Sequence, residues 1–385
     1  MTHVYHLLTE SEPFSEYHGG AISRWVANVL RSDDDSIVLA SAADNSWSFR
    51  QQRVQVVKCL LAYKKFNDIA GRMLPWRLRT QLLGVILRRA IRNIEPGDTV
   101  WVHNRPEFAA ALEPFIHLHQ AKLILFMHNS HLVERPEKLV RAIQADSYVF
   151  VSHYLEQQVL QKFPCIGKTK VLHGGADMTI FYPAVKIDSP IRVPVVLLAG
   201  RLVPDKGLHI FVDAMEILQK RNVQLDGVVL GGSGFGNVGP TTYLKEIQQR
   251  APSNVSFHAY CSGSALGARF READIFCMPA CWHEPLGLVV LEAMATGLAI
   301  VATRSGGIPE MLTQGGGILV TRGSAVELAD ALEQVAMDSA LRQRLAKEAY
   351  ASFQMSFTWT VVQRNYYKIL HDEASETLAA EVRLS

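Results

Sequence analysis

The sequence predicts an α/β protein built from two Rossmann-like domains. Strand-like runs recur along the whole chain, and most are separated by segments with apolar residues at helical spacing, such as Leu208–Leu218. This alternation indicates parallel sheets joined by crossover helices. A chain of 385 residues exceeds one average domain, and the segment Tyr182–Pro190, with a proline near each end, divides it into halves of ordinary size. Because such sheets bind ligands beyond the carboxyl ends of their strands, we expect two domains that face each other across a ligand-binding cleft.

The expected strands alternate with helices in both halves. Those of the first half are His3–Leu8, Ser36–Ala42, Thr99–His103, Lys122–His128, Tyr148–Ser152 and Lys170–His173. Those of the second half are Val195–Ala199, Gly227–Leu230, Val255–Ala259, Asp274–Pro279, Ala299–Thr303 and Ile318–Val320. Each half therefore has the strand content of one Rossmann-like sheet.

The composition is that of a soluble globular protein and indicates no particular class of partner. Hydrophobic residues make up 48% of the chain, and 39 basic against 37 acidic residues give a net charge of +2. No apolar run reaches the roughly 20 residues that span a bilayer, and no positive leader with an apolar core opens the chain. The five cysteines form no Cys-x-x-Cys pair, which fits a reducing compartment and gives no metal-ligand spacing. We therefore expect a cytoplasmic protein without a metal site.

The most informative stretch runs from Glu284 to Gly297 and carries two carboxylates eight positions apart. Pro285 and Gly287 suit a turn that opens a helix, and Gly297 offers a C-terminal stop. Glu284 therefore precedes the helix, and Glu292 lies within it. The free N–H groups of a helix N-terminus bind phosphate, and carboxylates accept hydrogen bonds from hydroxyls. The stretch thus predicts a site for a nucleotide diphosphate that carries a sugar.

This spacing resembles the Glu, seven residues, Glu signature of the retaining family 4 glycosyltransferases, which have the GT-B fold. Further stretches match the family in its own order: Val151–Ser152, His173–Asp177, Gly200–Gly207, Gly231–Gly234, Asp274–Pro279 and Ile300–Glu310. The family usually has Asn-Gly-Val-Asp where this chain has His173–Asp177. The resemblance implies a GT-B architecture with an acceptor-side domain over residues 1–183 and a nucleotide-sugar domain over residues 190–355. It also implies a C-terminal helix within residues 356–385 that crosses back to the first domain.

The resemblance assigns a donor site to the second half. Arg201 and Lys206 are expected to hold the diphosphate in place of a metal ion, Glu292 to bind the ribose hydroxyls and Glu284 to bind the transferred sugar. Read alone, each charged group could be a solvated surface residue, but the shared motif favours a site. The opening of the helix is expected to complete the donor site with Leu286, Gly287, Leu288 and Val289. No cofactor is expected besides the nucleotide sugar, which is a co-substrate.

The first half offers two glycines and a histidine for the same ligand. Gly19 and Gly20 follow the first strand and precede a helix, where backbone can approach a phosphate closely, and they match the family's glycine loop. His128 closes a strand at a position where the family often has a histidine that contacts the donor sugar near the reacting centre. It could equally be a satisfied structural residue. The expected catalytic set is His128, Glu284, Arg201 and Lys206.

A third strand end carries His103, Asn104 and Arg105. Polar side chains at the end of a buried strand face the region where ligands bind. These residues are expected to contact the acceptor, or alternatively to pack the domains.

A basic segment lies between residues 53 and 92. It carries ten Lys or Arg residues and one acid, Asp68. Apolar residues such as Leu60, Trp76 and Leu87 are interleaved, so the segment could form basic amphipathic helices on an anionic membrane surface. It could instead complete the core while its charges face water. No nucleic-acid recognition fold is evident, so nucleic acid is not an expected partner.

The resemblance implies a retaining, metal-independent hexosyltransferase. The expected donor is UDP-N-acetylglucosamine, UDP-glucose or another nucleotide sugar. The expected acceptor is a lipopolysaccharide core, another surface polysaccharide or a lipid-linked glycan, reached at the cytoplasmic face of the inner membrane. The alternative is a catalytically silent GT-B binding or scaffold protein of the cell envelope or spore coat. A sugar-nucleotide epimerase is a further alternative, which the spacing of Glu284 and Glu292 disfavours.

Overall fold

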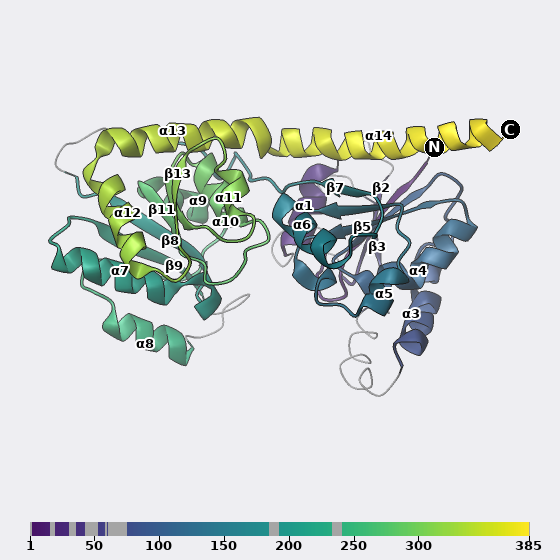
Figure 1. Ribbon diagram of the computed structural model, residues 1–385, viewed down its shortest axis with the longest axis horizontal. Helices are drawn as coiled ribbons and strands as arrows, with labels where there is room; N and C mark the ends of the chain where they lie inside the picture. The colour runs from purple at the N-terminus through teal and green to yellow at the C-terminus, as the bar shows by residue number, and fades with distance from the viewer. Residues whose placement is uncertain are drawn as a thin grey trace. The chain divides into compact units, whose positions relative to one another are not determined.

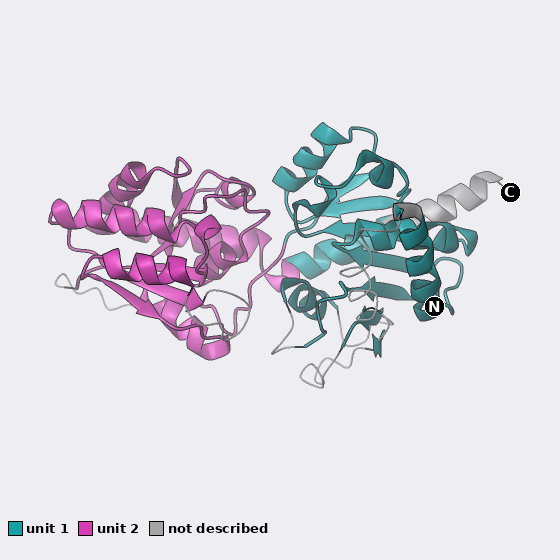
Figure 2. Cartoon of the chain, turned by 90° about the horizontal axis from the view of Figure 1, so that it is seen from below, with its two compact units in different colours: residues 1–173, 362–385 teal, residues 174–361 magenta. Residues whose placement is uncertain are grey.

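The computed structural model describes residues 2–15, 20–30, 36–42, 53–57, 60, 75–184, 192–232 and 241–384. The chain divides into two compact units, shown in teal and magenta in Figure 2. The first unit comprises Met1–His173 together with Val362–Ser385, and the second comprises Gly174–Val361. Of the hinge expected at 182–190, residues 185–190 lie outside the described part of the chain.

The first unit contains a seven-stranded sheet in the order β3-β2-β1-β4-β5-β6-β7, and neighbouring strands run parallel. Its strands are β1 (Val4–Leu7), β2 (Ser36–Ala40), β3 (Arg53–Val56), β4 (Thr99–His103), β5 (Lys122–Met127), β6 (Ser147–Phe150) and β7 (Thr169–Val171). Every run that the sequence predicts as a strand in this half forms one. The central strands are buried along nearly their whole length, as in a parallel sheet covered on both faces.

The strand β3 is not predicted from the sequence. Residues 53–56 open the basic segment, which could form helices or complete the core, and they pair with β2 at the edge of the sheet. Val54 and Val56 are 36% and 42% exposed. Gln55 between them is exposed as well, so both faces of this edge strand are open.

Helices surround this sheet (Figure 1). They are α1 (Ala21–Val29), α3 (Trp76–Ala90), α4 (Pro106–Leu118), α5 (Glu137–Arg141) and α6 (His153–Lys162), with the short 3-10 helix η2 (Ser130–Leu132). The last helix, α14 (Trp359–Leu384), contributes its residues from Val362 onward to this unit. Within the unit, Gln363 Nε2 donates to the carbonyl oxygen of Val29 at 3.1 Å, and Tyr366 is fully buried.

The second unit contains a six-stranded parallel sheet in the order β10-β9-β8-β11-β12-β13. Its strands are β8 (Val195–Arg201), β9 (Asp226–Gly232), β10 (Val255–His258), β11 (Ile275–Met278), β12 (Ala299–Thr303) and β13 (Gly317–Val320). Its helices are α7 (Leu208–Lys220), α8 (Thr242–Arg250), α9 (Gly263–Glu272), α10 (Leu288–Ala295), α11 (Ile308–Met311), α12 (Ala325–Met337) and α13 (Ser339–Ser356), with η3 (Pro204–Lys206). The apolar faces of α7 and α12 form one core with the sheet, in which Phe211 and Leu332 are fully buried.

Each sheet has one point at which the strand order reverses. In the second sheet the chain moves from β8 outward to β9 and β10, and then returns to β11 on the other side of β8. The loops after β8 and β11 therefore leave in opposite directions and open a crevice beyond the carboxyl ends of these strands. In the first sheet the corresponding point lies between β1 and β4.

Candidate active site

The carboxyl ends of β8 and β9 come so close that glycine is required there. Gly200 pairs with Gly231, and Arg201 pairs with Gly232. Gly231 has a φ of 151°, and a Cβ atom on it would lie 1.9 Å from the carbonyl oxygen of Gly200. A side chain at position 231 is therefore excluded, which leaves backbone accessible beside Arg201. Arg201 ends β8 at the switch point, with an exposed side chain.

Lys206 ends the 3-10 turn η3, which leads directly into α7. Gly207 has a φ of 74°, and a Cβ atom on it would lie 1.8 Å from the carbonyl oxygen of Pro279. The backbone N–H of Cys281 also donates to the carbonyl oxygen of Asp205 at 2.8 Å. These contacts fix the turn against the end of β11, so Lys206 meets the loop that follows this strand.

Glu284 lies in that loop and is only 9% exposed. Lys206 Nζ donates to Glu284 Oε2 at 2.5 Å, and Trp282 Nε1 donates to the same oxygen at 2.7 Å. Lys206 Nζ also lies 5.2 Å from the centre of the Trp282 ring. Among the described residues, no donor contacts Glu284 Oε1. That oxygen is available to accept a hydrogen bond from a ligand hydroxyl.

The turn after β12 holds the backbone of Glu284. The N–H of Gly307 donates to the carbonyl oxygen of Glu284 at 2.7 Å, and Ser305 Oγ donates to the carbonyl oxygen of Trp282 at 2.6 Å. Gly306 has a φ of 60°, and a Cβ atom on it would lie 1.9 Å from the Glu284 carbonyl oxygen. Any other residue at 306 would push the loop away, so this glycine positions the carboxylate.

Helix α10 begins at Leu288, four residues after Glu284. Its N-cap, Gly287, has a φ of 93° and no side chain, and the first turn carries no acidic residue. The N–H groups of Leu288 and Val289 have no acceptor within the helix, and together with the helix dipole they favour an anion. Glu292 lies one turn further along and is half-buried.

The second unit thus gathers an ammonium group, two carboxylates and a helix N-terminus at the switch point between β8 and β11. The ammonium group and the helix N-terminus can neutralise an anion, while the carboxylates accept hydrogen bonds from hydroxyls. The residues predicted for this site from the sequence lie at this edge of the sheet: Arg201, Lys206, Glu284, Leu286, Gly287, Leu288, Val289 and Glu292. Within the ranges that the structure describes, no cluster of three or more His, Cys, Asp or Glu residues could hold a metal ion.

Residues 185–352, which contain this site, match the family model described as glycosyl transferases group 1. This part of the chain is a group 1 glycosyltransferase domain. The chain is 26% identical over 294 residues to spore coat protein SA of Bacillus subtilis, which covers 71% of this chain and 78% of that protein. It is 30% identical over 198 residues to the lipopolysaccharide core biosynthesis glycosyltransferase LpsE of Rhizobium meliloti, 51% of this chain and 55% of LpsE.

Solved structures share this fold over nearly the whole chain. A glycosyltransferase from Rickettsia africae has a TM-score of 0.74 at 15% identity, and the match covers 96% of this chain and 98% of that chain. The structure of Anabaena HepE in complex with UDP-glucose has a TM-score of 0.68 at 19% identity, and the match covers 98% of this chain and 99% of HepE. The fold is therefore GT-B, as the resemblance in the sequence predicts.

In the first unit of this GT-B protein, three histidines and a tyrosine form a continuous row at the switch point between β1 and β4. His128 Nε2 lies 3.0 Å from His103 Nδ1, and His103 Nε2 lies 3.0 Å from His6 Nδ1. His6 Nε2 lies 2.9 Å from the hydroxyl of Tyr366 in α14. We call these four side chains the histidine array. They come from four segments: β1, the end of β4, the residue after β5, and the last helix.

Burial keeps the histidine array uncharged. It lowers the pKa of His6 to about 3 and that of His128 to about 3. Burial, followed by repulsion from the two neighbouring histidines, lowers the pKa of His103 well below its usual value. The centre of the Trp25 ring lies 5.9 Å from those of both His103 and His128, which helps to exclude water. Each histidine is therefore neutral at neutral pH, with one ring nitrogen that donates and one that accepts.

Asn104 and Arg105 both have partners within the first unit. Asn104, with a φ of 55°, accepts a hydrogen bond from the N–H of His128 on its Oδ1 at 2.7 Å. Arg105 Nε and Nη2 donate to the two carboxylate oxygens of Glu10 at 2.5 Å and 3.0 Å. Asn104 thus fixes the backbone of His128. The acceptor-side role of His103, Asn104 and Arg105 stays a prediction.

The glycine loop of the first unit is described only in part, because Gly19 lies outside the described residues. Gly20 is the N-cap of α1, and a Cβ atom on it would lie 2.6 Å from Glu12 Oε1. The same oxygen accepts from the N–H of Ser23 at 2.8 Å, and burial raises the pKa of Glu12. A carboxylate of the protein itself therefore occupies the N-terminus of α1. A donor contact at Gly19 and Gly20 stays a prediction.

Three residues of these clusters carry no role predicted from the sequence. The sequence could have revealed Trp282, because this residue lies two positions before Glu284. His6 is a polar residue in an otherwise apolar strand and pairs in register with Trp101. Tyr366 offers no local signal, because it meets His6 across a separation of 360 residues in the chain.

Proposed function

We propose that the protein is a retaining, metal-independent glycosyltransferase that moves a hexose or N-acetylhexosamine from a UDP-sugar to a lipopolysaccharide core or another surface polysaccharide. The arrangement of Lys206, Glu284 and the N-terminus of α10 at the switch point carries this proposal. The similarity to LpsE supports the acceptor class, and the UDP-glucose bound in the HepE structure supports the donor.

The charges of the site suit the departure of a nucleoside diphosphate. The donor diphosphate would lie at the N-terminus of α10 with Arg201 and Lys206, because a leaving group that gains negative charge is stabilised by N–H dipoles and fixed positive charge. Glu292 would accept from the ribose hydroxyls, and Glu284 from hydroxyls of the transferred sugar. With these cations in place, the leaving group needs no metal ion.

The stereochemical part of the proposal is substitution on the front face of the sugar through an oxocarbenium-like state. In this reaction the acceptor hydroxyl enters on the side from which the diphosphate leaves, so the anomeric configuration is retained. Glu284 is assigned to hydroxyl binding rather than to covalent attack on the sugar. His128 would contact the donor sugar near the reacting centre.

The substitution Glu284→Gln tests the site. Glutamine keeps the size of the side chain but loses the charge that strengthens the hydrogen bond to a sugar hydroxyl. Since a hydrogen bond to a charged group contributes about 1.5–3 kcal/mol, turnover should fall about 10- to 100-fold. The measurement is UDP or GDP release from a panel of nucleotide sugars, with and without acceptor.

Glu216→Gln is the matched control, because Glu216 is paired with Lys220 at 2.7 Å on an exposed face of the same unit. This variant should turn over the selected donor like the unaltered protein. Equal losses in both variants, or no loss in Glu284→Gln, would contradict the assignment of Glu284.

A catalytically silent binding or scaffold protein of the spore coat or cell envelope is the second candidate function. The similarity to spore coat protein SA favours it. The presence of Arg201, Lys206, Glu284 and Glu292 favours a working donor site instead. Calorimetric titration with the same panel separates the two functions, since a scaffold without a donor site should bind none of the nucleotide sugars.

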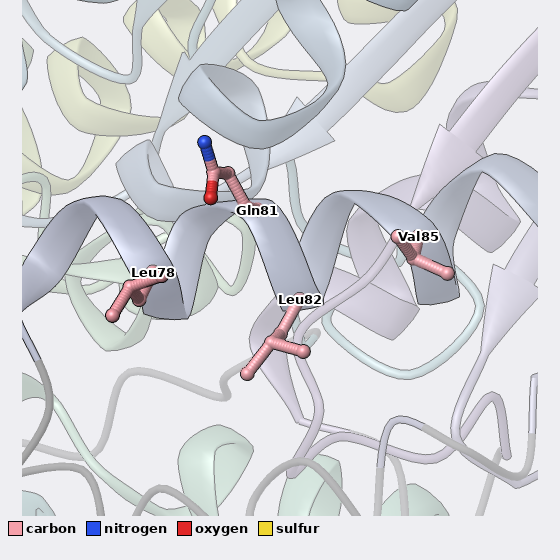
Figure 3. A pocket seen from close by; sticks show the side chains of 4 residues that line it. All are labelled: Leu78, Gln81, Leu82 and Val85. Carbon is pink, nitrogen blue, oxygen red and sulfur yellow. The ribbon is translucent and has the colours of Figure 1, made fainter.

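We further propose that the protein works at the cytoplasmic face of the inner membrane and contacts it through α3. Leu78, Leu82 and Val85 of this helix are 48%, 49% and 55% exposed. With Gln81 they line a pocket at this helix (Figure 3). Their spacing of four and three residues places them on a single face. No helix in the described part of the chain has both the length and the apolar content to cross a membrane.

The charges of α3 support an anionic lipid surface as the proposed partner of this face. Its sequence contains four arginines and no acidic residue. Arg88 and Arg89, in the last turn, are exposed, and so is Arg92 just beyond it. An apolar stripe flanked by basic residues lies at the headgroup boundary with its apolar side chains inserted and its cations on anionic headgroups.

Val85→Asp tests this contact, and Val326→Asp is its control, because the two valines are 55% and 56% exposed on helices of different units. Binding of Val85→Asp to phosphatidylglycerol vesicles should weaken about tenfold, since an inserted valine contributes about 1.5 kcal/mol. Val326→Asp should bind unchanged. Equal binding of the unaltered protein to phosphatidylglycerol and phosphatidylcholine vesicles, or an unaffected Val85→Asp, would contradict the proposal.

A further inference from the structure

The histidine array occupies one ring nitrogen of His128 and leaves the other for a ligand. His128 Nε2 meets His103 Nδ1 at 3.0 Å. No donor or acceptor of the described residues contacts His128 Nδ1, and the residue is only half-buried. Nδ1 is therefore the atom through which His128 can meet an oxygen of a ligand.

The protons of the array have to be ordered together. Each contact needs one proton between its two heavy atoms, and each neutral histidine supplies one N–H and one lone pair. If Tyr366 donates to His6 Nε2, then His6 Nδ1 donates to His103 Nε2, and His103 Nδ1 donates to His128 Nε2. If the order reverses at one contact, it reverses at all of them. The identity of the donor at one end therefore sets the tautomer of His128 at the other.

Tyr366 favours the first of these two orders. The lone pairs of a phenol oxygen are conjugated with the ring, so a phenol is a better hydrogen-bond donor than acceptor. A Tyr366 hydroxyl that donates to His6 places the proton on Nδ1 in all three histidines. His128 then presents an N–H group at Nδ1, whereas free histidine prefers the tautomer protonated at Nε2.

We propose that Tyr366, His6 and His103 are positioning residues that hold His128 as its Nδ1–H tautomer, so that His128 donates a hydrogen bond to an oxygen of the bound sugar donor. The role of the ligand rests on the proposed function, but the tautomer does not. Within the first unit, the array runs from the residue after β5 to the last helix of the chain.

The surroundings of the array suit this role. His6 stacks on Trp101 with ring centres 5.9 Å apart, and Trp25 packs edge-on against Phe126 at 4.8 Å. These rings keep water away from His6 and His103, which are fully buried and where a water molecule would disturb the proton order. Because the histidines also stay neutral, His128 should offer the same N–H group across the physiological pH range.

The test is the tautomer of each histidine in the full-length, ligand-free protein, read from long-range nitrogen–proton NMR correlations after labelling with 15N-histidine. In the unaltered protein, His6, His103 and His128 should all carry the proton on Nδ1. Tyr366→Phe removes the hydroxyl that sets the order, so all three should shift together toward the Nε2–H tautomer. Tyr148→Phe is the matched control, because its buried hydroxyl donates to the carbonyl oxygen of Ile143 in the same unit.

A His128 that carries its proton on Nε2 in the unaltered protein would overturn the proposal, and so would unchanged tautomers in Tyr366→Phe. The first of these measurements needs no variant, so it holds even if a substitution impairs folding. Donor turnover, measured beside the spectra, should fall about two- to tenfold in Tyr366→Phe and stay unchanged in Tyr148→Phe. If no nucleotide sugar is turned over, the proposed function fails while the spectra still decide the tautomer.

Discussion

Glu284 shows how a buried carboxylate can be kept ready for a ligand. An unpaired carboxylate at 9% exposure would be costly, and in the ligand-free protein Lys206 and Trp282 compensate it. Under the proposed function, the arriving donor supplies a hydroxyl to Glu284 and a diphosphate to Lys206. Each charge then exchanges one partner for another, so neither is left buried alone when the site fills.

The histidine array makes the first unit sensitive to acid. His6 and His128 have folded-state pKa values of about 3, whereas an unfolded histidine titrates near 6.5. Between these values the unfolded state binds more protons, so the free energy of unfolding rises with pH and is lost as the pH falls from about 6.5 toward 3. From pH 7.5 to pH 5.5 each such histidine should cost the first unit about 1 kcal/mol.

Urea unfolding at the two pH values, followed by amide hydrogen exchange of β1 and β4, measures this loss in the first unit. In His6→Gln the number of protons taken up on unfolding should fall by about one, because the substituted side chain no longer titrates. The free energy of unfolding should then depend less on pH. His117→Gln is the control, since His117 has 35% of its side chain exposed. An identical pH dependence in the unaltered protein and His6→Gln would contradict the account.

At the scale of elements, the parallel strands are the part of the fold that the sequence predicts best. Buried parallel strands are continuous apolar runs, and β4 and β12 have the predicted bounds, Thr99–His103 and Ala299–Thr303. The strand β8 continues past its predicted end at Ala199 to Arg201, because the close pairing of Gly200 with Gly231 extends the ladder. The edge strand β3 is not predicted, because its four residues are too few to form a continuous apolar run and the last three of them are exposed.

The site around Glu284 is built from short sequence motifs, whereas the histidine array is not. Lys206, Glu284 and the opening of α10 follow from short motifs, in which the glycines impose the turns that bring the charges together. The histidine array depends on contacts between segments far apart in the chain, which no local pattern encodes. The sequence also does not predict that Glu12 occupies the N-terminus of α1, although Glu12 lies only 11 residues before its partner Ser23.

At the scale of the whole molecule, the first unit is assembled from two separate pieces of the chain. It comprises Met1–His173 and Val362–Ser385, with the entire second unit inserted between them. The returning piece of α14 supplies Tyr366 to the array and bonds to the backbone of Val29 through Gln363. The tautomer proposed for His128 therefore depends on the end of the chain having docked on its beginning.

Tyr366→Ala should show this dependence as a local loss of stability. Tyr366 is fully buried, and truncating a large buried aromatic side chain costs about 3–5 kcal/mol. Amide hydrogen exchange should accelerate in β1 and β4, while β8 and β11 keep their protection, because they have a separate core. Tyr350→Ala, in α13 of the second unit, should leave β1 and β4 unchanged. Equal acceleration in both sheets after Tyr366→Ala would show instead that the two units unfold together, and the last helix would then stabilise the whole molecule rather than the first unit alone.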